Sequence, residues 1–338
     1  GIFEFLEHLA VANDELEAFG LAAFKGHAVD LAFEVDGDAV AVLGGFAFGA
    51  HGKGAALLAQ DVQGAVSDGA DVVGAGVDGQ GHVNLNALLD LITADTLLVS
   101  IMQVNNEVGA INDIATINRM MKARASNALL HVDGVQGYLK VPCSARDCDL
   151  YSISGHKFHA PKGVGALYIK KNVRFLGGQM GGGQENGLRS GTTNTPGILA
   201  METAALDYMQ HTEAYRQQMM QCKQRLYQNL MRLPDVVLNG PSPDQGAPHI
   251  LNLSFLGVGG EVLLHALEEK AIFVSTGSAC SAHKKGKNRI LNAMGVVGER
   301  QEGAIRFSLC HDNTPAEMDE TAEAIAGLLI TLRRFRRR

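Results

Sequence analysis

Short apolar runs alternate with helical patterns along this chain from about residue 90 onward. Residues 96–102, 128–133 and 149–154 each form a run of strand length, and residues 114–125 have helical periodicity. A further run at 165–169 follows so closely that it predicts a hairpin-like return. Such alternation is typical of an α/β domain with a largely parallel sheet, in which ligands bind at the carboxyl ends of the strands.

A second domain is predicted after a long helix. Residues 201–232 contain no Pro or Gly, and the following Leu-Pro pair ends the helical pattern. We place the boundary near residue 205, so that residues 76–205 form a large domain and residues 206–338 a compact α+β domain. The strands expected in the second domain are 249–256, 272–275 and 304–309, and the expected helices are 261–267 and 315–334.

Residues 1–75 form an atypical N-terminal segment. They contain no Arg, Thr, Tyr, Pro, Cys or Met, while Ala, Gly, Val, Phe and acidic residues dominate. Residues 39–45 have the composition of a strand, but the turn signals around them are poor. The segment therefore gives no clear prediction of structure.

Charge and cysteine content exclude several classes of protein. The formal net charge of −7 and the pI near 5.9 argue against nucleic-acid binding as the main role. The five cysteines form neither a disulfide framework nor a zinc-site pattern, so we expect reduced thiols in a cytoplasmic protein without a metal site. No run of about 18 apolar residues and no secretory signal is evident, so neither a membrane span nor export is expected.

Lys157 stands in Ser154-Gly155-His156-Lys157, at the end of the apolar run 149–154. A lone lysine at such a place is interpreted as a surface loop residue. Ser154 and His156 change that interpretation, because a hydroxyl and an imidazole are suited to holding a phosphate. A lysine whose amine can become neutral forms a Schiff base with an aldehyde cofactor, so the motif favours a pyridoxal phosphate site.

Asp133 ends the run 128–133, and Gln136 lies one turn further on. A carboxylate here would keep the ring nitrogen of pyridoxal phosphate protonated, which makes the cofactor an electron sink. An N-cap aspartate is the alternative that the residues leave open. Asn106, in Asn105-Asn106-Glu107-Val108-Gly109, either belongs to a turn or hydrogen-bonds a cofactor hydroxyl or a substrate carboxylate.

Three further candidates lie downstream. Thr192 ends the glycine-rich residues 181–192, which are either a flexible linker or a loop that approaches a ligand. Arg306, on the run 304–308, either makes a surface salt bridge or clamps a carboxylate bidentately. Cys280 stands in Gly277-Ser278-Ala279-Cys280 and is followed by two lysines, a setting that lowers a thiol pKa and makes the cysteine nucleophilic.

Together these motifs resemble those of cysteine desulfurases, of the class V aminotransferase family with the fold-type I pyridoxal phosphate architecture. The order and spacing fit from about residue 76 to the C-terminus. The resemblance implies an α/β large domain with a mostly parallel sheet and a smaller α+β C-terminal domain that carries the cysteine loop. The matching stretches are Val104-Asn105-Asn106-Glu107-Val108-Gly109, His131-Val132-Asp133, Ser154-Gly155-His156-Lys157, Arg189-Ser190-Gly191-Thr192, Gly277-Ser278-Ala279-Cys280 and Arg306-Phe307-Ser308-Leu309.

The resemblance also implies a role for each candidate. Lys157 forms the Schiff base and moves protons, and Asp133 holds the pyridine nitrogen. Cys280 takes the substrate sulfur as a persulfide and passes it to an acceptor protein for iron–sulfur assembly or tRNA thiolation. Arg306 and Asn106 hold the carboxylate of L-cysteine. The other cofactor contacts, in a homodimer, are Gln136 and Asn106 on the phenolic oxygen side, Ser154 and His156 at the phosphate, and Thr192 at the phosphate of the other subunit.

The N-terminal motifs of the family are absent from residues 1–75, including its phosphate loop and its ring-stacking histidine. His51 lies in roughly the right region, but its neighbours do not match the motif. The segment is either a divergent replacement or a stretch translated in a wrong frame. Two alternatives to an active desulfurase follow. One is a catalytically impaired desulfurase-like protein that acts through partner or subunit binding, and the other is a transaminase, against which Cys280 argues because transamination needs no thiol.

Overall fold

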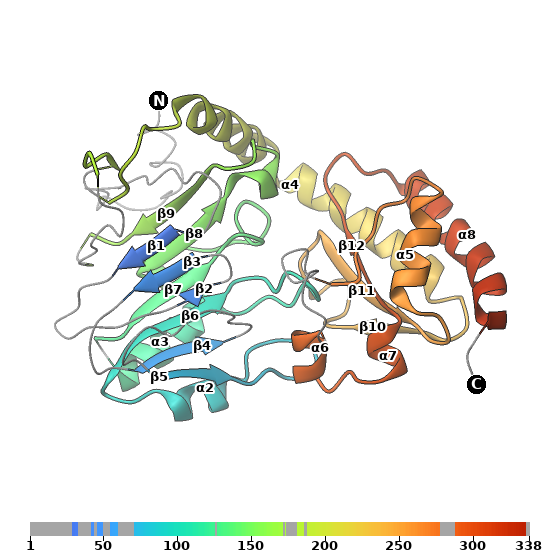
Figure 1. The fold of residues 1–338 in the computed structure, drawn as a ribbon, viewed down its shortest axis with the longest axis horizontal. Helices are drawn as coiled ribbons and strands as arrows, with labels where there is room; N and C mark the ends of the chain where they lie inside the picture. Colours follow the sequence, from blue (N-terminus) through green and yellow to red (C-terminus); the bar gives the residue numbers. More distant parts are fainter. Residues whose placement is uncertain are drawn as a thin grey trace. The chain divides into compact units, whose positions relative to one another are not determined.

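A computed structural model describes residues 29–32, 42–43, 46–49, 55–59, 71–125, 127–171, 173, 181–185, 188–277 and 288–335 (Figure 1). The chain forms two compact units. The large unit comprises Gly1–Gly76, Val83–Gln103 and Asn112–Gln210. The small unit comprises Val77–His82, Val104–Ile111 and His211–Arg338. Two short segments from the first third of the chain thus belong to the small unit, and one of them contains Asn106.

A six-stranded sheet forms the centre of the large unit, in the order β5-β4-β6-β7-β8-β9. Neighbouring strands are parallel except for β9, which returns antiparallel to β8. The apolar runs become strands because their side chains are buried on both faces, as the adjacent and oppositely directed Leu98 and Val99 show. The expected parallel sheet and hairpin return are confirmed. The strands are β4 (Ala55–Ala59), β5 (Asp71–Ala75), β6 (Thr96–Met102), β7 (Leu129–Asp133), β8 (Leu150–Ser154) and β9 (Gly165–Ile169).

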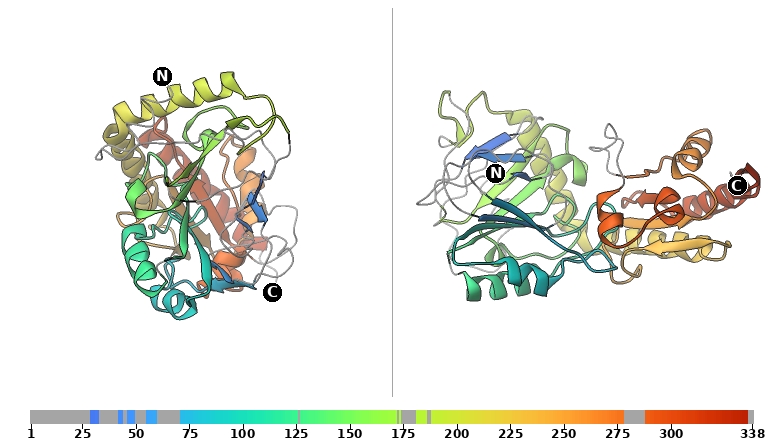
Figure 2. Two further views of the ribbon diagram at one scale, coloured as in Figure 1. Left: turned by 90° about the vertical axis from the view of Figure 1, so that its left-hand side faces the viewer. Right: turned by 60° about the horizontal axis from the view of Figure 1, so that its bottom comes forward.

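Helices α2 (Leu85–Leu91) and α3 (Ile114–Arg124) lie next to each other on the same side of this sheet (Figure 2). Side chains cap both N-termini, because Asn84 accepts from the backbone N–H of Ala87 and Asp113 accepts from that of Thr116. Helix α3 buries Ile114, Ile117 and Met121. Two 3₁₀ turns follow, η1 (Ala145–Asp147) and η2 (Gly155–Phe158).

The N-terminal segment contributes more regular structure than its composition indicated. Strand β4, at residues 55–59, lies between β5 and β6 in the large sheet. Strands β1 (Val29–Ala32), β2 (Val42–Leu43) and β3 (Phe46–Gly49) form a separate three-stranded sheet. The strand expected over residues 39–45 is described only at its centre, as β2.

Helix α4 (Thr195–Leu230) begins six residues earlier than the Met201 start that the sequence predicts. Pro196 and Gly197 lie before the predicted start, yet both fit the first turn of a helix. Proline lacks only an N–H that has no intrahelical partner there, and Asn194 Oδ1 accepts the N–H of Gly197 over 3.2 Å.

None of the helices in the described part of the chain combines the length and the apolar character that a membrane span requires.

The small unit has an antiparallel sheet in the order β10-β11-β12. An apolar core surrounds Leu253, Phe255, Leu263 and Ile325. Helix α8 begins with a capping box in which Thr314 and Glu317 satisfy each other's backbone N–H groups. The elements are β10 (Val236–Asn239), β11 (Ile250–Phe255), α5 (Gly260–Glu268), α6 (Arg289–Ala293), α7 (Glu299–Glu302), β12 (Ala304–Ser308), α8 (Pro315–Leu332) and η5 (Arg333–Phe335).

One predicted strand of the small unit is wrong. Residues 272–275 read as an apolar strand, but only Ser275 pairs with the sheet, through an isolated bridge to Arg306. Phe273 is 80% exposed, so this apolar run does not supply a core face. The strand was predicted from apolar composition alone. Composition does not show whether the segment lies along a sheet edge with which it can pair.

Candidate cofactor and substrate sites

Polar side chains end two neighbouring parallel strands of the large unit. Asp133 ends β7 and Ser154 ends β8, and Asp133 pairs in register with Ser152. Ser152 and Ser154 lie two residues apart on one strand, so both belong to the sheet face that also carries Asp133. Because carboxyl ends of parallel strands are where α/β sheets bind ligands, these positions are the natural start of a site.

Asp133 lies in a buried environment that disfavours its charged form. Burial raises the pKa of this carboxyl to about 6, although the backbone N–H of Val135 and the nearby charge of Lys157 both act to lower it. The Val135 N–H donates to Asp133 Oδ1 over 3.0 Å. Burial makes the charged form of this carboxyl unfavourable, so a cationic partner such as a protonated ring nitrogen would stabilise it.

The loop after Asp133, which carries Gln136, packs closely against side chains of the sheet. A Cβ at Gly134 would collide with the ring of Tyr151, and one at Gly137 would collide with the side-chain amide of Gln103. Tyr151 donates its hydroxyl to Gln103 Oε1 over 2.5 Å. The two glycines therefore let the loop lie directly against side chains of the sheet, with Gln136 three residues after Asp133.

Lys157 lies in the 3₁₀ turn η2, whose backbone is held from two sides. Lys140 is buried and donates its ammonium to the Lys157 carbonyl over 2.6 Å. The N–H of Gly155 donates to the Val164 carbonyl over 2.9 Å. Phe158, next in the chain, is 1% exposed. The backbone of Lys157 is thus fixed while its partly exposed side chain extends from a rigid turn.

Ser154 and His156 form a pair beside that turn. Ser154 Oγ lies 2.9 Å from His156 Nδ1. Burial, together with the positive charges of Lys157 and Lys162, lowers the pKa of His156. A neutral imidazole next to two ammonium groups is a setting that favours an anion such as a phosphate.

Thr192 is exposed, at the end of a loop that folds back on itself. Arg189 is buried and donates through Nη1 to the carbonyls of Gly191 and Thr192, each over 3.3 Å. The N–H of Gly191 donates to Gln184 Oε1 over 2.9 Å. The glycine-rich segment is therefore an ordered loop in the described residues 181–185 and 188–192, where Gly183 and Gly191 adopt positive φ.

His131 is a residue of this sheet to which the sequence assigned no role. Its Nδ1 lies 2.9 Å from Ser100 Oγ and its Nε2 lies 2.8 Å from Ser152 Oγ, so neighbours on β6 and β8 hold both ring nitrogens. Burial lowers the pKa of His131 to about 3, so the ring is neutral. An alternating pattern, with His131 and Asp133 two apart on an apolar strand, was the signal that both share one face.

In the small unit, Arg306 and Asn106 lie together. Arg306 Nη1 donates to the backbone carbonyl of Asn106 over 3.0 Å. Both residues are partly exposed. The two candidates that the resemblance assigns to the substrate carboxylate are therefore brought into contact within one unit, whereas Lys157, Asp133, Gln136, Ser154, His156 and Thr192 belong to the large unit.

Cys280 lies outside the described residues, so its assignment stays a prediction. The four described cysteines are free thiols. Burial raises the pKa of Cys148 well above its usual value and also raises that of Cys222. Those two thiols are poor nucleophiles at neutral pH.

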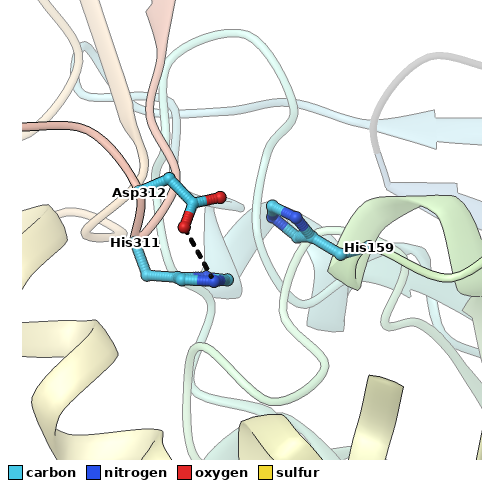
Figure 3. Close-up of side chains that lie close together, drawn as sticks. All are labelled: His159, His311 and Asp312. Carbon is cyan, nitrogen blue, oxygen red and sulfur yellow. Dashed lines mark ion pairs between the residues drawn. The ribbon is translucent and has the colours of Figure 1, made fainter. Parts of the chain in front are cut away.

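The small unit also carries an ion pair at the start of the loop after β12. His311 Nε2 lies 3.5 Å from Asp312 Oδ1 (Figure 3). The ring of Tyr215, from α4, stacks on His311 with 3.7 Å between centroids. His159, also drawn in that view, belongs to the large unit.

Comparison with known families gives this arrangement its context. Residues 51–320 match the class-V aminotransferase family. The chain belongs to this family. The match begins at residue 51, before the residue-76 start that the motifs indicated, and so includes β4 and β5.

This class-V aminotransferase family member resembles proteins named as cysteine desulfurases. It is 38% identical over 260 residues to the cysteine desulfurase of Trichormus azollae, covering 76% of this chain and 64% of the relative. It is 40% identical over 257 residues to the cysteine desulfurase IscS of Salmonella paratyphi C, covering 75% of this chain and 62% of the relative. The chain thus spans somewhat less than two thirds of the length of these curated relatives.

A solved structure of a NifS-like protein superposes on this family member with a TM-score of 0.76 at 36% identity. The superposition covers 83% of this chain and 76% of the other. The expected α/β architecture of fold-type I pyridoxal phosphate enzymes is therefore confirmed.

Enzymes of this family depend on pyridoxal phosphate. The described residues fit such a cofactor. The large unit combines a primary amine on a rigid turn, a carboxyl whose burial favours a cationic partner, and a hydroxyl–imidazole pair beside two ammonium groups. These are the functional groups that the aldehyde, the ring nitrogen and the phosphate of the cofactor require.

Proposed function

We propose that this chain is a pyridoxal phosphate-dependent cysteine desulfurase, which converts L-cysteine to L-alanine and leaves a persulfide on Cys280. The observation that carries the proposal is that Asp133 ends β7 and that the turn with Lys157 directly follows the neighbouring parallel strand β8. Burial raises the pKa of the Asp133 carboxyl to about 6 there, against the opposing charge of Lys157. Identities of 38% and 40% to proteins named cysteine desulfurases support the choice of this reaction within the family.

In this proposal the large unit holds the cofactor. Lys157 would hold the cofactor at its aldehyde and would move protons, and Asp133 would hold the protonated ring nitrogen. When bound, pyridoxal phosphate draws electrons from the bonds at the substrate Cα. The remaining contacts are Ser154 and His156 at the phosphate, Gln136 and Asn106 on the phenolic oxygen side, and Thr192 at the phosphate of the other subunit of a homodimer.

Arg306 and Asn106 hold the substrate carboxylate, and Cys280 accepts the sulfur. A Cys280 thiolate attacks the sulfur of L-cysteine, an S–S bond forms, and the bond between that sulfur and Cβ breaks. The electron pair of the broken bond stays with Cβ, which takes up a proton. One thiol and one L-cysteine thus give one persulfide and one L-alanine, so the substrate sulfur is oxidised and its carbon is reduced without an external redox partner.

The persulfide is passed to an acceptor protein for iron–sulfur assembly or tRNA thiolation. We also propose that the protein acts as a homodimer in the cytoplasm. Free thiols among the described cysteines support a reducing compartment.

A second candidate follows from the missing N-terminal motifs, because residues 1–75 lack the family's ring-stacking histidine and phosphate loop. In that case the chain is catalytically impaired and acts by binding an acceptor protein or another desulfurase subunit. It would bind such a partner without releasing alanine.

Alanine release from L-cysteine, measured with the thiol state of the protein, separates the two. The wild-type protein should release alanine and carry a persulfide, and Cys280→Ala should do neither while still changing the cofactor absorbance on addition of L-cysteine. Cys143→Ala is the matched control, because Cys143 is an exposed thiol outside both sites, and it should behave as wild type. Alanine release that persists in Cys280→Ala would contradict the proposed sulfur transfer.

A further inference from the structure

A row of buried polar side chains crosses the sheet of the small unit. Asn239 on β10 pairs in register with Asn252 on β11, and Asn252 pairs in register with Arg306 on β12. Asn239 is 0% exposed and Asn252 is 3% exposed. Register partners on neighbouring strands share a sheet face, so the three side chains form one row that ends at Arg306.

This row holds two consecutive backbone carbonyls. Arg306 Nη1 donates to the carbonyl of Asn106 over 3.0 Å, and Asn252 Nδ2 donates to the carbonyl of Glu107 over 3.0 Å. Two neighbouring side chains of one cross-strand pair therefore bind two neighbouring peptide groups. The segment that carries Asn106 is thus fixed against the same strands that carry Arg306.

The direction of each hydrogen bond in the row is determined by Arg300. A guanidinium only donates, so Asn239 Oδ1 must accept the bond from Arg300 Nε over 2.9 Å. The amide nitrogen of Asn239 then donates to Asn252 Oδ1 over 2.8 Å. The amide nitrogen of Asn252 is therefore the donor to the Glu107 carbonyl. Arg300 thus determines the orientation of the Asn252 amide through Asn239.

We infer that Asn252 is a positioning residue of the substrate-carboxylate site: it holds the Asn106–Glu107 segment so that Asn106 and Arg306 present their groups to one carboxylate. The inference rests on the proposed function for the role of Asn106 and Arg306. Asn252 itself touches no substrate and acts through the Glu107 carbonyl. A bidentate clamp depends on geometry, so displacement of this segment weakens carboxylate recognition more than amine recognition.

The test compares two amines that differ in a carboxylate. L-alanine and ethylamine contain no sulfur, so neither is turned over by the proposed reaction. Their binding to the protein supplied with pyridoxal phosphate is measured by isothermal titration calorimetry. The wild-type protein should bind L-alanine more tightly than ethylamine, and Asn252→Ala should weaken L-alanine binding by about tenfold, the effect of one lost hydrogen bond, with ethylamine unchanged.

Ser254→Ala is the matched control. Ser254 is buried on the same strand, accepts from Asn239 Nδ2 over 2.7 Å and donates to the Arg300 carbonyl over 2.6 Å, but it is bonded to neither carbonyl of the Asn106–Glu107 segment. It should lower stability and leave the preference for L-alanine intact. If Asn252→Ala does not fold, Asn252→Ser replaces it, because its hydroxyl fills part of the space and cannot reach as far as the amide.

Equal weakening of both ligands in the Asn252 variants, or an unchanged preference for L-alanine, would overturn the inference. So would a wild-type protein that does not distinguish the two ligands. Alanine release from L-cysteine reports separately on the proposed function. A wild-type protein that prefers L-alanine, loses this preference in Asn252→Ala and still releases no alanine from L-cysteine would support the role of Asn252 and contradict the desulfurase. In an active protein, Asn252→Ala should raise KM for L-cysteine by about tenfold with a smaller change in kcat.

Discussion

The guanidinium of Arg306 donates a hydrogen bond to the backbone carbonyl of Asn106 over 3.0 Å, across 200 residues of sequence. One of the five N–H donors of the arginine is therefore used to fix its orientation. A guanidinium oriented in this way suits a carboxylate, which it binds through two parallel bonds. The contact joins two residues from separate motifs that the family resemblance assigns to the same carboxylate.

Replacing Arg306 with lysine should therefore damage substrate binding more than folding. A lysine keeps the charge but loses the fork that contacts a carboxylate and the Asn106 carbonyl together. We expect Arg306→Lys to raise KM for L-cysteine by about 10- to 100-fold, which corresponds to roughly 1.5–3 kcal/mol. Steady-state kinetics measures the change.

Asn106→Ala provides a useful contrast to that variant. It removes the side chain but retains the backbone carbonyl that holds Arg306, so the guanidinium should keep its orientation. Its effect on KM should be smaller than that of Arg306→Lys. An equal or larger effect would mean that the side chain of Asn106, and not the orientation of Arg306, dominates carboxylate binding.

Asp133 should destabilise the cofactor-free protein at neutral pH. Its pKa is raised to about 6 in the folded state from 3.8, so the unfolded chain loses this proton more readily than the folded protein. Stability is therefore lost as the pH rises from 3.8 to 6, by up to about 3 kcal/mol. Asp133→Asn should be more stable than wild type at pH 8 by up to that amount, with little difference at pH 4, as urea unfolding measures.

The same variant should bind pyridoxal phosphate more weakly, because a neutral amide does not hold a proton on the ring nitrogen. Gain of stability with loss of cofactor affinity is the pattern of a residue kept for function. An Asp133→Asn protein that is less stable than wild type at pH 8 would show that the carboxylate is satisfied within the large unit without a cofactor.

His131 should make the folded protein less stable as the pH falls, whereas Asp133 makes it less stable as the pH rises. Its pKa is lowered to about 3 in the folded state from 6.5, so below pH 6.5 the unfolded chain takes up a proton that the folded protein excludes. Stability is lost as the pH falls, by about 2 kcal/mol at pH 5. His131→Gln should be less stable than wild type at pH 8, but this difference should shrink by about that amount at pH 5. An unchanged difference would indicate that His131 is protonated in the folded protein.

Gly134→Ala should destabilise the large unit, because the new methyl group would collide with the Tyr151 ring. Overpacking of this kind costs about 1–3 kcal/mol, which denaturant unfolding resolves. Gly76→Ala is the control, since a Cβ there meets no atom within 4 Å. Equal stability of the two variants would mean that the loop after Asp133 can shift, and with it Gln136.

Most of the sheet could be predicted because it follows from burial. The runs that became β6, β7 and β8 are largely apolar and are buried on both faces, as central parallel strands are. The short antiparallel return at β9 followed from the brief connection. Residues 272–275 show the limit of the same argument, because their apolar composition could not report that only Ser275 meets a sheet edge.

The candidate site could be predicted residue by residue but not as a network. Lys157, Asp133 and Arg306 stand out because charged residues follow or interrupt apolar runs. Asn239 and Asn252 do not stand out, because their role depends on strand register and on the hydrogen bond from Arg300. Arg300 and Asn239 are 61 residues apart in the sequence. Alternation of Asn252 and Ser254 with leucine and phenylalanine on β11 was the only sequence signal of a polar row.

The most direct test of a cofactor site formed by Lys157 and Asp133 is the visible absorbance of the purified protein with added pyridoxal phosphate, before and after L-cysteine. The wild-type protein should be yellow, with an absorbance band that changes when L-cysteine is added while alanine accumulates, and the Lys157→Ala variant should lack the band. A wild-type protein that stays colourless in excess pyridoxal phosphate would contradict the claim that Lys157 and Asp133 form a working cofactor site.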